Sequence, residues 1–130
     1  MTGHEEQRHL LTQIMKDLSE SGRRWTGHRE LTLAGVRCLR DLMVRQSIES
    51  IAEPGLQGEA SRGMIALDDA LTRITVDRGQ GALVIELIFF GGLTGEEIAE
   101  ALGISFEAAG RHFSSARATL SGELKNVLGL

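Results

Sequence analysis

The chain has 130 residues, of which 42% are hydrophobic, and its formal net charge is −4 at pH 7. It contains one proline and no tyrosine. This composition does not suit a β-sheet protein, because strands favour aromatic and β-branched residues, so an all-α fold is expected. No apolar run approaches the roughly 20 residues that span a bilayer, and the acidic start differs from a signal peptide, so we expect a cytoplasmic protein without membrane contact.

The sequence carries no recognisable catalytic, cofactor or metal site. Cys38 has no histidine at zinc-ligand spacing and is best interpreted as a small buried hydrophobe. The pair Gly79-x-Gly81 lacks the third glycine and the preceding strand of a dinucleotide-binding loop, and no Gly-Lys-Ser/Thr occurs. We therefore predict that the protein is not an enzyme and uses no cofactor and no metal.

Two helices are expected in the N-terminal part of the chain. Apolar residues at helical spacing predict one helix over 7–18 and a second over about 28–51. Between them, Trp25 is expected to anchor the core rather than to stack on a nucleic-acid base. The second helix carries an arginine stripe, expected to be solvated and paired with neighbouring acids such as Asp41 or Glu49. The arginines of this stripe are Arg29, Arg37, Arg40 and Arg45.

A polar stretch divides the chain into two parts. Residues 54–63 contain the only proline and three glycines, which is typical of a linker. We therefore predict an N-terminal helical segment over 1–53, a linker over 54–63 and a C-terminal domain over 64–130. Each part by itself is close to the lower size limit for an independent hydrophobic core.

The first half of the predicted C-terminal domain contains two apolar segments. A helix is expected over 65–75, followed by a short break around 77–81. Residues 82–90 are apolar on every side except at Glu86, and by periodicity alone this segment could be a buried strand. We favour a helix because the chain offers no partner strands. Such a helix must be covered by its neighbours or by a second copy of the protein.

The pattern of a helix-turn-helix follows. Thr94 and Glu97 have the spacing of a capping box, which starts a short helix at Thr94 or Gly95. Gly103 ends that helix in a sharp turn, and Ser105 caps the next one. Small Ala99 allows the two helices to approach closely where they cross. The predicted scaffold consists of these caps and the inward-facing residues: Thr94, Glu97, Ile98, Ala99, Leu102, Gly103, Ile104, Ser105, Ala109 and Phe113.

A family resemblance is carried by residues 89–94 (FFGGLT), 97–105 (EIAEALGIS) and 116–118 (ARA) followed by Leu120. These stretches resemble the C-terminal, promoter-reading domain (region 4) of bacterial RNA polymerase sigma factors of the extracytoplasmic-function (ECF) type. The strong likeness covers roughly 66–124.

The resemblance implies an all-α small helical bundle that ends in a sigma-type helix-turn-helix. It also implies a transcription initiation factor or promoter-binding regulator, whose partners are promoter DNA and the RNA polymerase core. The N-terminal segment is only faintly similar to the end of the sigma domain that reads the minus-ten element. On this interpretation the N-terminal sigma domain is truncated or degenerate.

The exposed face of the second helix of the motif, over 106–124, is the expected DNA-reading surface, because its first residues enter the major groove. Arg111 is the candidate for a bidentate contact to guanine, Glu107 for accepting from cytosine N4, and Ser114 or Arg117 for holding phosphate. Related sigma factors usually carry a basic residue where this chain has a glycine. The predicted DNA-binding residues are Phe106, Glu107, Gly110, Arg111, Ser114 and Arg117.

The charge of this region leaves a second hypothesis open. Residues 91–130 carry three basic residues against five acidic ones, so we expect weak DNA binding unless polymerase assists. The alternative is a sigma-like protein-interaction module that has lost DNA reading. It would form a homodimer, or hold a regulatory partner such as an anti-sigma protein, through the apolar helix 82–90.

Overall fold

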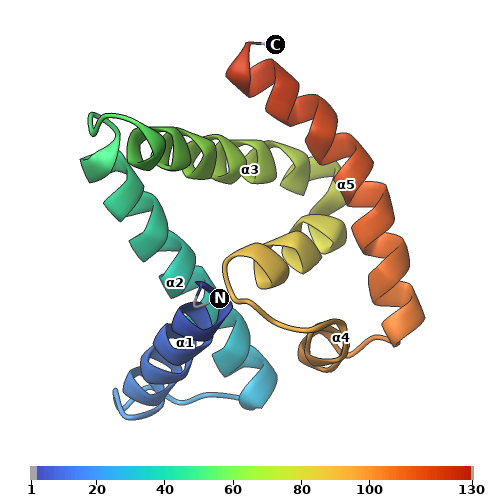
Figure 1. Ribbon diagram of the computed structural model, residues 1–130. Coiled ribbons are helices and arrows are strands. Elements are labelled where there is room, and N and C mark those ends of the chain that lie inside the picture. Colours follow the sequence, from blue (N-terminus) through green and yellow to red (C-terminus); the bar gives the residue numbers. More distant parts are fainter. Residues whose placement is uncertain (1–2, 130) are drawn as a thin grey trace.

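The structure is a computed structural model that describes the backbone of residues 3–129 and the side chains of residues 5–129. Within this range the structure has helices and connecting loops but no strands, so the predicted all-α bundle is confirmed (Figure 1). None of the described helices combines the length and apolar character that crossing a bilayer requires. The helices are α1 (Gly3–Ser19), α2 (His28–Ser50), α3 (Leu56–Phe89), α4 (Gly95–Leu102) and α5 (Phe106–Leu128).

The long helix α3 organises the fold. Figure 1 shows it running from the end of α2 towards α5 and then turning back. It packs against α2, α4 and α5, while α1 packs on α2 and α4 contacts both α2 and α5. Its inward residues are almost fully buried and form the centre of a single hydrophobic cluster, which includes Ala70, Leu71, Ile74, Val84, Ile85, Leu87 and Phe90.

The predicted linker differs most from the structure. Residues 56–63 form the first turns of α3, so only the short stretch between Ser50 and Leu56 is outside a helix. The chain folds back tightly here, as Gly58 shows: a Cβ atom on this residue would collide with the backbone carbonyl oxygen of Glu53. α3 also packs against α2, and this packing overrides the low helix propensity of the glycines in this stretch.

The two segments predicted over 65–75 and 82–90 belong to the same element. The break expected around 77–81 is a kink at Arg78, whose φ of −130° and ψ of 44° are not helical. Residues 82–89 are helical, as predicted, Phe90 is the C-cap, and the chain itself covers residues 82–90. Of these nine residues only Phe89 is exposed, at 50%.

A buried ion pair explains the single charge on this apolar segment. Glu86 is only 3% exposed, and its Oε2 accepts a hydrogen bond of 2.9 Å from Arg40 Nη1. Arg40 Nε also donates to Asp68 Oδ1 at 2.6 Å, and its guanidinium lies 5.4 Å from the ring centre of Phe90. Burial alone would lower the pKa of Arg40, but the hydrogen bonds that its guanidinium donates to Glu86 and Asp68, together with their negative charges, outweigh burial and raise that pKa.

Two expectations for the N-terminal part are corrected by these contacts. Arg40 pairs with α3 rather than with a neighbouring acid of its own helix. Trp25 is half-buried rather than central to the core: its indole N–H donates to the Leu18 carbonyl at 3.0 Å, and the Arg23 guanidinium lies 4.4 Å from its ring centre. Trp25 therefore packs at the C-terminal end of α1 and satisfies one of its free carbonyl groups. Cys38, expected to be buried, is partly exposed.

Candidate nucleic-acid interface

The local signals of the motif produce the expected geometry. The Thr94 hydroxyl accepts from the Glu97 backbone N–H at 3.2 Å, and the Glu97 carboxylate accepts from the Thr94 N–H at 2.9 Å, which completes a capping box. Gly103 has a left-handed conformation, with φ 68° and ψ 34°, and Ser105 then caps α5 by accepting from the Ala108 N–H at 3.0 Å. The short helix, the turn and the second helix therefore follow one another as in a helix-turn-helix.

The inner face of this motif packs on α3 and α2. The Ala99 carbonyl accepts from the Ile104 N–H at 3.0 Å, which holds the turn closed beneath the crossing of the two helices. The remaining scaffold residues divide by burial. Ile98, Ala99 and Ala109 are buried, while Leu102, Ile104 and Phe113 are half-buried.

The predicted DNA-binding residues lie along the outer side of α5, and each of them is exposed: Phe106, Glu107, Gly110, Arg111, Ser114 and Arg117. No carboxylate among the described side chains lies within 4.0 Å of Arg111 or Arg117. Phe106 differs from the others because its ring lies against Gly95, where a Cβ atom would be 2.7 Å from Cε1. Phe106 therefore also links the two helices of the motif.

The N-terminal helix is clamped onto the start of this motif. Arg8 donates to both carboxylate oxygens of Glu97, at 2.7 and 2.8 Å, and to the carbonyl of Gly92 at 3.2 Å. Gln7 Nε2 donates to the Phe89 carbonyl at 2.7 Å. The hydrogen bonds from Arg8 and from the Thr94 backbone outweigh burial and lower the pKa of Glu97 to about 2. No local pattern in the sequence points to this contact, because its partners lie 89 residues apart.

Replacing Arg8 with alanine is expected to raise the pKa of Glu97 towards its ordinary value of 4.5. The stabilisation from a lowered carboxylate pKa is present above pH 4.5 and is lost as the pH falls towards 2. The Glu97 side chain is 40% exposed, so solvent screening keeps this contribution below about 1 kcal/mol. A carboxyl NMR titration, with Arg24→Ala as the control, measures the change. An identical Glu97 pKa in the two variants would show that the ion pair does not form in solution.

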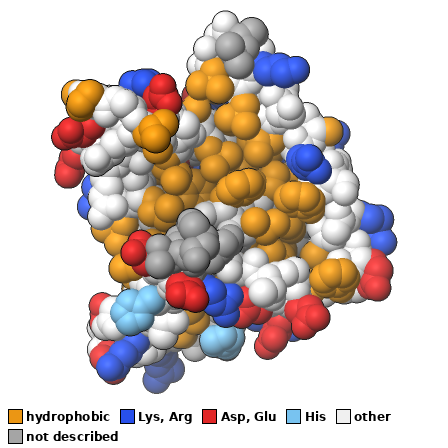
Figure 2. Space-filling model, in the orientation of Figure 1, with side chains coloured by type: hydrophobic (Ala, Val, Ile, Leu, Met, Phe, Trp, Pro, Cys, Tyr) orange, Lys and Arg blue, Asp and Glu red, His pale blue; other side chains and the backbone are white. Residues whose placement is uncertain are grey.

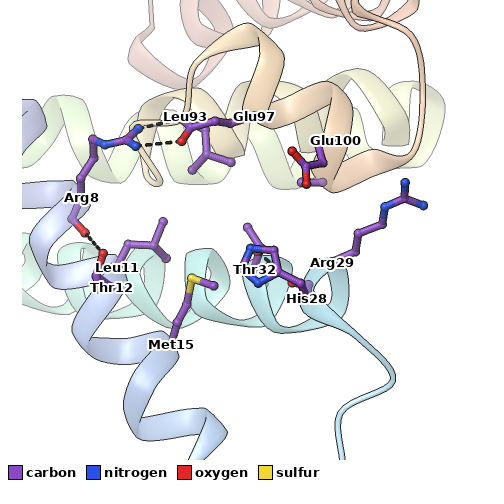
Figure 3. Close-up of a pocket in the computed structure, with 11 residues that line it drawn as sticks. Arg8, Leu11, Thr12, Met15, His28, Arg29, Thr32, Leu93, Glu97 and Glu100 are labelled. Carbon is purple, nitrogen blue, oxygen red and sulfur yellow. Dashed lines mark hydrogen bonds and ion pairs between the residues drawn. The ribbon is translucent and has the colours of Figure 1, made fainter.

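A cavity of about 360 Å³ lies where α1, α2 and α4 meet (Figure 3). Its apolar wall includes Leu11 and Met15, and charged groups from both halves of the chain surround its mouth. Figure 3 shows Arg29 extending from the start of α2 alongside the end of α4, near Glu100. The start of α2 therefore lies next to the end of α4, on the side of the motif where the turn to α5 begins.

A second surface is apolar. Figure 2 shows hydrophobic side chains gathered in the hollow framed by α2, α3 and α5. Part of this surface is a groove of about 230 Å³ between α3 and α5, lined by Phe89, Leu120 and Leu124, with Arg117 at its edge. Within the described residues no cluster of three or more His, Cys, Asp or Glu side chains could hold a metal ion.

Residues 12–126 match the family model for ECF sigma factor. This match includes α2 and half of α1, and so extends well beyond the 66–124 region where the resemblance by motif is strong. No curated protein and no solved structure matches the chain.

Proposed function

Because the chain belongs to the ECF sigma factor family and so has a role in transcription initiation, we propose that it reads promoter DNA through the exposed face of α5. The observation that carries this proposal is the position of Arg111 in the early turns of the second helix of the motif. This arginine is exposed and has no carboxylate partner among the described side chains. Its guanidinium is therefore available to a base.

The spacing of the exposed residues supports entry into the major groove. Gly110, Arg111 and Ser114 lie three, four and seven residues after Glu107, so the four residues share one face of α5. A guanidinium there can donate two hydrogen bonds to guanine O6 and N7, and the carboxylate of Glu107 can accept from cytosine N4. Outside the backbone of its own helix, nothing lies within 4 Å of the position of a Cβ on Gly110, so the backbone of α5 can approach the base edges closely.

RNA polymerase is the partner expected to supply most of the affinity. The motif contributes few cations, whereas binding to the DNA backbone depends on neutralising phosphates. The ECF sigma factor family implies contact with both polymerase and promoter DNA. We infer that polymerase holds the chain on DNA while α5 selects the sequence.

The test compares wild type with Arg111→Ala in binding to a random library of promoter DNA, with and without core RNA polymerase, at two salt concentrations. Loss of one bidentate contact costs about 1–3 kcal/mol, so we expect roughly 5-fold to 150-fold weaker binding and a relaxed preference at one base pair. Arg62→Ala, an exposed arginine at the start of α3, is the control. Equal binding by wild type and Arg111→Ala under every condition would contradict DNA reading by α5.

A protein-interaction module is the second candidate, and the apolar groove between α3 and α5 favours it. A homodimer or an anti-sigma protein docked there would cover Phe89 and the edge at Arg117, and would so compete with DNA. The helix 82–90 itself offers little surface for this purpose, since Phe89 is its only exposed residue. A monomeric mass in solution, together with no partner recovered from cell extract, would count against this candidate.

A further inference from the structure

Arg29 is placed beside the turn of the motif although it lies far from it in sequence. Its Nη1 atom is 2.7 Å, and its Cζ 3.2 Å, from the position that a Cβ atom on Gly103 would occupy. Gly103 is the left-handed residue at the end of α4, two residues before the cap of α5. Arg29 is exposed, and no carboxylate among the described side chains lies within 4.0 Å of it.

The charges around this position are otherwise mostly acidic. The first turn of α4 carries Glu96 and Glu97, and its last turn has no basic residue. Glu100 borders the same cavity as Arg29, and Glu107 follows in the first turn of α5. Arg8 forms a bidentate ion pair with Glu97 and so neutralises the charge of that carboxylate. The N-terminal helices therefore supply two cations to an acidic motif, one of them already paired and one available.

We propose that Arg29 binds a phosphate of the DNA backbone next to the turn when α5 enters the groove. This inference rests on the proposed function. In helix-turn-helix complexes, residues that flank the reading helix hold phosphates and set its register on the duplex. A guanidinium suits this contact because it donates parallel hydrogen bonds to phosphate oxygens. The DNA-binding surface is then built from both halves of the chain.

A purely structural role would also place a cation here. Positive charge near a helix C-terminus favours the helix dipole, and Arg29 stands at the end of α4. The two roles differ in one measurable respect. A phosphate contact releases counterions from DNA, so its loss changes the salt dependence of binding, whereas loss of helix stabilisation changes stability and leaves that dependence unaltered.

The experiment measures binding of random-sequence duplex DNA by the full chain in complex with core RNA polymerase over a series of salt concentrations. The variants are Arg29→Gln, Arg29→Lys and Arg111→Ala, with Arg62→Ala as the matched surface control. For Arg29→Gln we expect the slope of log Kobs against log salt to become shallower by about 0.9, with equal weakening on all sequences. Arg29→Lys and Arg62→Ala should keep the wild-type slope, and thermal unfolding verifies that each variant is folded.

Each other outcome is decisive. If Arg29→Gln keeps the wild-type slope while Arg111→Ala weakens binding, the phosphate contact is refuted and DNA reading by α5 stands. A weaker affinity at every salt concentration with the wild-type slope assigns Arg29 a structural role only, which also refutes the proposal. If Arg29→Gln changes the slope but Arg111→Ala has no effect, the phosphate contact holds and the reading role of α5 fails. Absence of binding by wild type refutes both.

Discussion

Replacing Glu86 with alanine is expected to lower the free energy of unfolding by about 3 kcal/mol. Removing one partner of a buried ion pair leaves the other charge uncompensated, which typically costs about 3–5 kcal/mol. The lower end applies here, because Arg40 keeps its 2.6 Å hydrogen bond to Asp68, which is partly exposed to water. Urea unfolding followed by circular dichroism measures the difference.

The double variant Arg40→Met with Glu86→Leu is the control for this result. It removes both charges and fills the site with apolar side chains, and such replacements are often neutral or stabilising. We therefore expect the double variant to be more stable than Glu86→Ala. A loss below about 1 kcal/mol for Glu86→Ala would mean that water reaches the pair in solution and that the pair adds little to the packing of α2 on α3.

Replacing Gly81 with valine is expected to cost about 3 kcal/mol, because α3 and α5 cross at this residue without room for a side chain. A Cβ atom on Gly81 would meet the Cβ of Ala116 and would lie 2.8 Å from the carbonyl oxygen of His112. Neither obstacle can rotate away, because one is the Cβ of an alanine and the other is a backbone carbonyl of α5. Overpacking of this kind forces the helices apart and typically costs about 1–3 kcal/mol, with larger values where the backbone must move.

Gly122→Val is the matched substitution on α5. Gly122 is exposed, and nothing lies within 4 Å of a Cβ atom there. Valine and glycine differ little in helix propensity, so we expect a change within about 0.5 kcal/mol. Similar thermal transitions for the two variants would show that α3 and α5 leave room for a side chain where they cross.

Several local features were predictable from sequence because their causes are local. The capping box joins Thr94 and Glu97 across three residues, and Ser105 caps α5 over the same interval. Gly103 ends α4 because glycine readily adopts the left-handed conformation that the chain has there. Signals of this range set the positions of α4 and α5, and apolar periodicity places α1 and α2 within a few residues of their observed bounds.

The length of α3 shows where such signals lose their value. The proline and glycines of 54–63 predicted a linker, yet most of this stretch is helical in the structure. Glycine lowers helix propensity but does not forbid a helix, and the contact with α2 decides between the two. The break predicted around 77–81, by contrast, is confirmed by the kink at Arg78, where two helical segments of α3 meet.

The candidate interface was predicted in part. Helical periodicity predicts which face of α5 is exposed. Each residue predicted to bind DNA lies on that face, and each is exposed in the structure. The contributions of Arg8 and Arg29 could not be predicted. Their side chains reach Glu97 and Gly103 only because α1 and α2 pack against α4.

The sequence by itself therefore determined the all-helical character, the caps, the turn and the face that α5 presents. These depend on interactions between residues three or four positions apart, which a linear pattern records. Only the tertiary structure decided which charges meet: Arg40 with Glu86 across 46 residues, and Arg8 with Glu97 across 89. Such pairs form because apolar burial brings distant helices together, and that burial can be satisfied by many arrangements of the same pattern.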